Sequence, residues 1–113
     1  MTRPIRFHPA AKRELNEAAE FYDSEDLGLG GAFLDAAERA FEQIQAFPES
    51  SPISLAPVRA KVLSAFPFSV IYWVTDDVII VLAVAHHRGI HLLLRQSPRR
   101  PHPWYETPAA ASP

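Results

Sequence analysis

Three consecutive residues that could take part in catalysis follow an apolar run in the sequence: His86, His87 and Arg88. Histidine titrates near neutral pH, so it can accept or donate a proton during a reaction. Arginine binds phosphate oxygens in a bidentate manner. The set could therefore supply proton transfer and charge stabilisation at a phosphate group. The alternative is structural, with one histidine bonding a carbonyl at a strand end while its neighbour faces water.

Two further cations, Arg59 and Lys61, alternate with apolar residues along the segment 58–63. A strand would place both on one face, where they could complete a basic patch with Arg88 across a sheet. In that role they would anchor an acidic partner segment or a target. They could equally form the solvated face of an edge strand, where cations discourage aggregation.

Aromatic residues divide between the expected core and the expected surface. Tyr72 and Trp73 are neighbours in a strand-like segment, so one should be buried and the other exposed, and an exposed aromatic is a candidate contact residue. Spacing along the helical segments places a further group in the core: Leu15, Tyr22, Phe33, Phe41 and Phe47.

Composition narrows the class of protein. The chain has no cysteine, which excludes a disulfide scaffold, a thiolate metal site and a cysteine nucleophile. Its five histidines lack zinc-like spacing, so we expect neither a metal nor a cofactor. The longest apolar run, residues 78–85, is far shorter than the ~18 residues of a membrane span, and no signal peptide is visible at the N-terminus. We therefore expect a cytoplasmic protein without a membrane partner.

The net charge of −2 conceals an asymmetry along the chain. Residues 1–50 hold five basic and ten acidic side chains, a net −5, whereas residues 51–113 hold six basic and three acidic, a net +3. We expect a solvated acidic helical face and a separate basic face on which an anionic partner could dock.

The segments that must position these residues follow from hydrophobic periodicity. The pattern predicts a strand over residues 3–8, a helix over about 9–26, a glycine break at 27–31, and a second helix from about residue 30 that Pro48 ends. A proline-rich loop over 48–57 and three strands over 58–63, 68–74 and 78–85 follow. The fold class is therefore α+β, in the order β-α-α-β-β-β, with a helical hairpin on one face of a mostly antiparallel sheet.

We expect one domain over residues 1–96 and a proline-rich, flexible tail over 97–113. Because the hairpin covers one side of the sheet, the apolar side chains of residues 78–85 that face the other side are expected to stay open for a partner.

Four segments in this order resemble the RelE/ParE superfamily of toxins from bacterial type II toxin–antitoxin systems, and within it the ParE-like plasmid stabilisation proteins. They are the Ala-Lys-Arg-Glu-Leu to Phe-Tyr pattern of residues 11–22, the Leu-Gly break and helix start of 27–36, the Val-Arg, Phe-Pro-Phe and Ile-Tyr pattern of 58–72, and the Ala-His strand end of 81–86. The resemblance covers about residues 3–88 and implies the same α+β fold.

The C-terminal end departs from the family pattern. Arg88 is followed by the extra segment 90–97, and only then come Arg99, Arg100 and, further on, Trp104, which resemble the expected Arg-Pro-aromatic ending. Either Arg88 or Arg100 takes the family's arginine position.

The resemblance implies a growth-inhibiting toxin that binds DNA gyrase without being an enzyme, is neutralised by a cognate antitoxin and can form a hetero-oligomer with it. Its contact surfaces would be the helical hairpin and a basic C-terminal region, and the contact residues for target or antitoxin would be Arg59, Lys61, Tyr72, Trp73, Arg88, Arg99, Arg100 and Trp104.

A second possibility is a RelE-like endoribonuclease that acts on mRNA at the ribosome with His86, His87 and Arg88. The position at which the superfamily's nucleases carry a phosphate-binding arginine falls on Ser69, and this departure disfavours nuclease chemistry. A third possibility is a decayed toxin that only binds an antitoxin.

Overall fold

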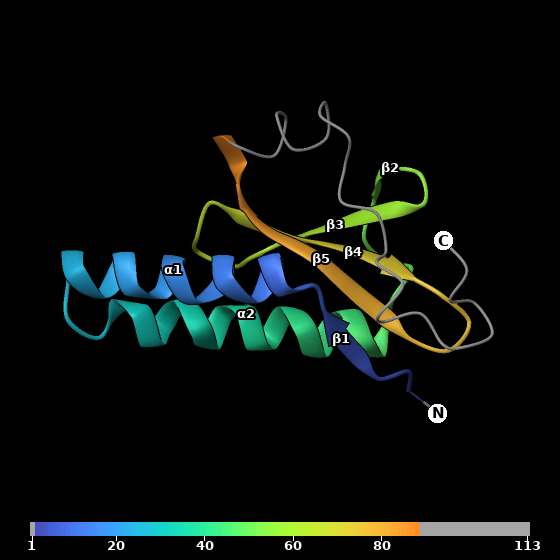
Figure 1. The fold of residues 1–113 in the computed structure, drawn as a ribbon, viewed down its shortest axis with the longest axis horizontal. Helices are drawn as coiled ribbons and strands as arrows, with labels where there is room; N and C mark the ends of the chain where they lie inside the picture. Colours follow the sequence, from blue (N-terminus) through green and yellow to red (C-terminus); the bar gives the residue numbers. More distant parts are fainter. Residues whose placement is uncertain (1, 89–113) are drawn as a thin grey trace.

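The computed structural model describes residues 2–88 and shows an α+β arrangement, as the sequence predicts (Figure 1). In chain order the elements are β1 (Ile5–Phe7), α1 (Pro9–Glu25), α2 (Leu29–Ala46), β2 (Ile53–Leu55), β3 (Val58–Val62), β4 (Phe68–Val74) and β5 (Ile79–His86). The five strands form one sheet in the order β1-β5-β4-β3-β2. Only the pair β1 and β5 is parallel, so the sheet is mostly antiparallel.

The helical hairpin is fixed at its joint by side chains and by glycine. The Asp23 carboxylate accepts hydrogen bonds from the backbone N–H groups of Gly28 and Gly30, at 3.2 and 2.7 Å, and so caps the start of α2 from α1. Gly28 has a φ of 91°, the left-handed conformation that glycine adopts without a steric cost. At Gly30 the helices approach so closely that a Cβ would collide with the backbone oxygen of Ala19.

One layer of core side chains lies between the hairpin and the sheet. Phe33 is fully buried, and it packs with Tyr22, Phe66 and Phe68 in an aromatic cluster whose ring centroids lie 5.0–6.1 Å apart. Burial raises the pKa of the Tyr22 hydroxyl. Two of the remaining predicted core residues, Leu15 and Phe41, are partly buried against the same core.

Phe47 is a wrong prediction, since it is 68% exposed. It is the C-cap of α2, with a φ of −137° and a ψ of 70°. Because its backbone is not helical, helical periodicity does not apply to Phe47. Its ring therefore does not lie on the buried face of α2, on which Ile44 lies one turn earlier.

The predicted loop over residues 48–57 contains a strand that the sequence analysis missed. This strand, β2, has only three residues and pairs with β3 through an irregular register. Edge strands tolerate prolines, and β2 lies at the edge of the sheet between Pro52 and Pro57. The proline-rich composition therefore hid a short strand, and β3, which was a candidate edge strand, lies inside the sheet.

The expectation of an open second face is also wrong. Ile80 and Leu82, which point away from the helices, are only 1% and 3% exposed and form a second cluster with Val78, Val58 and Trp73. The central strand β5 is therefore buried on both of its faces over residues 79–84.

Candidate functional site

The structure places His86 and His87 on opposite faces of the sheet. The ring of His86 packs against the core residue Phe68, with centroids 5.1 Å apart, and is half-buried. The Nε2 atom of His87 lies 3.1 Å from the hydroxyl of Ser69, which follows Phe68 on β4 and points to the other face. The two imidazoles therefore do not form one acid–base pair around a single substrate atom.

The neighbouring contacts give both histidines a structural role. His86 accepts a hydrogen bond at Nδ1 from the backbone N–H of Arg88, at 3.0 Å. The backbone N–H of His87 donates to the carbonyl of Pro67, at 2.9 Å, which extends the pairing between β5 and the start of β4. Ser69 is buried and carries no charge, so it supplies no cation that could hold a phosphate beside the two histidines.

Arg59 does not join Arg88 in a basic patch. Its guanidinium donates to the backbone carbonyls of Glu49 and Ser51, at 3.2 and 2.7 Å, and so holds the loop that follows α2. It pairs with Tyr72, four residues along β4 from the partner of His86, a separation of about 13 Å along the strand. The basic side chains therefore fall into separate places on the sheet.

The other predicted contact residues differ in accessibility. Tyr72 is fully buried and its hydroxyl donates to the carbonyl of Pro48, at 2.7 Å, so it is a core residue and offers no contact surface. Trp73 lies on the other face, as the predicted alternation requires, but it is half-buried against the cluster of Val78, Ile80 and Leu82 and is not the exposed side chain that was expected. Lys61 is half-buried and Arg88 is exposed. Arg99, Arg100 and Trp104 lie outside the described residues, as does the predicted domain boundary at residue 96.

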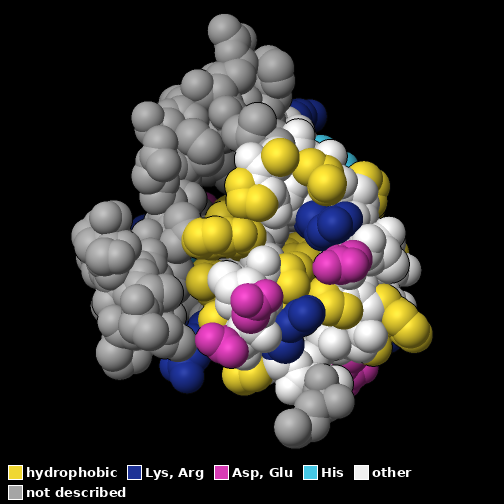
Figure 2. Space-filling view, turned by 90° about the vertical axis from the view of Figure 1, so that its right-hand side faces the viewer, with side chains coloured by type: hydrophobic (Ala, Val, Ile, Leu, Met, Phe, Trp, Pro, Cys, Tyr) yellow, Lys and Arg dark blue, Asp and Glu magenta, His cyan; other side chains and the backbone are white. Residues whose placement is uncertain are grey.

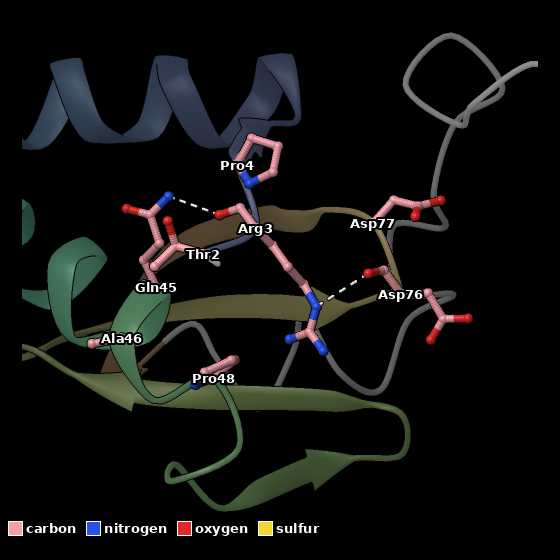
Figure 3. A pocket seen from close by; sticks show the side chains of 8 residues that line it. All are labelled: Thr2, Arg3, Pro4, Gln45, Ala46, Pro48, Asp76 and Asp77. Atoms are coloured by element: carbon pink, nitrogen blue, oxygen red, sulfur yellow. Dashed lines mark hydrogen bonds between the residues drawn. The ribbon is translucent and has the colours of Figure 1, made fainter.

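An open cleft of ≈ 630 Å³ lies at the opposite end of β5 from the histidines (Figure 3). The Nε atom of Arg3 donates across it to the carbonyl of Asp76, at 3.3 Å, and the Gln45 side chain donates to the carbonyl of Arg3, at 2.7 Å. These bonds tie the N-terminal segment to the β4–β5 turn and to α2. The sequence did not predict this junction. Its bonded residues are separated by 42 and by 73 positions along the chain, and no local pattern connects residues that far apart.

Two further observations concern the part of the chain that the structure describes. No group of three or more histidine, cysteine, aspartate or glutamate side chains in residues 2–88 is arranged to hold a metal ion. Neither described helix is long and apolar enough to cross a membrane.

Comparisons with known proteins agree with this geometry. The family model described as ParE toxin of the type II toxin–antitoxin system parDE matches residues 5–91. A solved structure of the chromosomal ParDE system from P. aeruginosa has a TM-score of 0.56 and 20% sequence identity, and the match covers 74% of this chain and 95% of that one. No curated protein matches the sequence. The structural likeness shows a shared fold, and the family match spans most of the chain. The protein therefore belongs to the ParE toxin family and is the toxin component of a type II toxin–antitoxin system, with an antitoxin as its partner.

Proposed function

We propose that this toxin acts in the cytoplasm by binding and inhibiting DNA gyrase, without catalysing a reaction itself. The observation that carries the proposal is the division of His86 and His87 between opposite faces of the sheet, beside an uncharged Ser69. A ribonuclease would need a base, an acid and a phosphate-binding cation around one phosphate. The family match supports the same choice.

Only accessible side chains can contact the target or the antitoxin. Lys61, Trp73 and Arg88 are the described candidates, and Arg99, Arg100 and Trp104 have the same role by sequence. A partly exposed tryptophan is a typical hot-spot residue of protein interfaces. The antitoxin would cover such a surface in a hetero-oligomer, and this would block the target from it.

Induction of the toxin gene, with pulse-labelling of DNA and protein synthesis, tests the choice of target. We expect DNA synthesis to fall first, with an SOS response, while protein synthesis initially continues. Purified toxin should inhibit supercoiling by gyrase to the same extent in the wild type and in the double variant His86→Ala, His87→Ala.

The rival functions give different results in the same experiment. Early arrest of translation with cleaved mRNA, abolished by the double histidine variant, would identify a ribonuclease. Unaffected growth, together with tight binding of the neighbouring gene product, would identify a decayed toxin that only binds an antitoxin.

A further inference from the structure

The half of the helical hairpin that surrounds its turn carries charge of one sign only. Residues 17–38 contain seven acidic side chains and no lysine, arginine or histidine. All seven acidic residues are exposed: Glu17, Glu20, Asp23, Glu25, Asp26, Asp35 and Glu38. Natural surfaces usually intersperse both signs, and a large field of one sign attracts a partner of the opposite sign.

This acidic half ends in a projection beyond the sheet. Tyr22 and Phe33 of the hairpin pack on Phe66 and Phe68. Phe66 lies in the turn before β4 and Phe68 is the first residue of β4, so the hairpin contacts this end of the sheet. The residues between them, 23–32, extend past the sheet (Figure 1). The Asp23 bonds to Gly28 and Gly30 hold the joint in one conformation, so the projection can dock without first being ordered.

Three large apolar side chains accompany the acidic residues. Leu27, in the turn, is 92% exposed, whereas Phe21 and Leu34 are 57% and 39% exposed. At 100° per residue Phe21 lies about 200° around α1 from Ala19, which faces α2 at Gly30. Phe21 therefore points away from α2, whereas Leu34, one turn after Gly30, lies toward α1. A flat partner cannot contact all three, but a groove that surrounds the projection can.

The opposite end of the molecule has a different surface. In Figure 2, which looks at the end remote from the hairpin turn, lysine or arginine and aspartate or glutamate side chains alternate among the hydrophobic ones. The single-signed charge therefore belongs to the projecting hairpin and is not a general property of the described surface.

We propose that the hairpin tip, residues 21–34, inserts into a groove of its target lined by lysine and arginine, of the kind that holds a nucleic-acid backbone. The carboxylates would pair with cations that otherwise contact phosphates, and Leu27 would enter an apolar recess at the base of the groove. This inference rests on the proposed function, under which the groove is the one in which gyrase holds DNA. The toxin and DNA then compete for it.

Purified gyrase holoenzyme, the full-length toxin and a fluorescent linear duplex test the inference. The tip variant Glu25→Gln, Asp26→Asn, Leu27→Ser should raise the Kd for gyrase at least about tenfold. A matched control at the opposite end, Asp76→Asn, Asp77→Asn, Phe47→Ser, removes the same charge and one exposed apolar side chain and should bind within about twofold of wild type. Excess duplex should displace the wild-type toxin.

The outcomes separate this inference from the proposed function. If wild-type toxin neither binds nor inhibits gyrase, both are overturned. If it inhibits gyrase but the tip and control variants bind equally, or if duplex and toxin bind gyrase together, only the inserted tip is overturned. Circular dichroism and thermal unfolding confirm that each variant is folded, and the single change Leu27→Ser provides a milder test.

Discussion

Glu14 shows how one side chain can take the place of a missing strand. The strand β1 ends at Phe7, opposite Val81, whereas β5 continues to His86. Beyond β1, the backbone N–H of Val84 donates to the Glu14 carboxylate of α1, at 3.0 Å. A buried N–H group without an acceptor would destabilise the fold, so Glu14 completes the edge of the sheet at this point.

Replacement of Glu14 by alanine should therefore lower the free energy of unfolding by about 1.5–3 kcal/mol, the range for hydrogen bonds to charged groups. The matched control Glu17→Ala, an exposed change on the same helix, should stay within about 0.5 kcal/mol of wild type. Urea unfolding followed by circular dichroism measures both. Equal stability of the two variants would contradict the role given to Glu14.

Two tyrosines provide a second comparison at this scale. The hydroxyl of Tyr72 bonds to the carbonyl of Pro48, so Tyr72→Phe should lower the free energy of unfolding by about 1 kcal/mol. The half-buried Tyr22 contributes its ring to the aromatic cluster, so Tyr22→Phe should be close to neutral. Thermal unfolding of both variants checks the difference, and a larger loss for Tyr22→Phe would argue against it.

Between elements, the contact of α1 with α2 determines the shape of the hairpin. The pair Gly28 and Gly30 has two distinct tasks: the first turns the chain with a positive φ, and the second allows the helices to touch. Gly31, which follows, has open space around the position of a Cβ. Three glycines that look alike in the sequence therefore differ in what they permit.

Gly30→Ala should destabilise the protein by about 1–3 kcal/mol, because the added methyl group collides with the α1 backbone at Ala19. Gly31→Ala should instead be neutral or stabilising by up to about 1 kcal/mol, since alanine favours helix. Chemical denaturation of the two variants distinguishes them. Similar stabilities would show that the helices separate easily at this level.

At the scale of the whole molecule, three surfaces are separate from one another: one at each end of β5 and one at the tip of the helical hairpin. The cleft at Arg3 lies at one end of β5, and His86, His87 and Arg88 lie at the other. The acidic hairpin tip projects past the sheet (Figure 1). A toxin with separate surfaces can bind its target through more than one of them, and an antitoxin that covers any surface needed by the target then neutralises the toxin.

Because an antitoxin binds the folded toxin and not the unfolded chain, it should raise the thermal stability of the toxin. At a free antitoxin concentration 100 times the Kd, the gain is about 2.7 kcal/mol, or about 10 °C in Tm for a domain of this size. Differential scanning calorimetry with increasing antitoxin measures it. A protein of similar size and net charge that is not the antitoxin should leave Tm unchanged, and an equal shift with that protein would argue against specific binding.

The sequence alone determined the two helices, four of the five strands and the order of these elements along the chain, because periodicity and proline or glycine breaks act within a few residues along the chain. Pro9 and the glycines near residue 28 marked helix ends that the structure reproduces. The ordered family segments also pointed to a toxin of this class, which the family match confirms.

Only the tertiary structure decided which side chains lie close to one another. Strand register put Arg59 beside Tyr72 and away from His86, and pleating sent His86 and His87 to opposite faces. The strand β2, the buried second face of β5 and the exposed Phe47 likewise depend on neighbours distant along the chain. Local spacing fixes the direction of a side chain relative to its own element, but the partner it meets depends on how the elements pack.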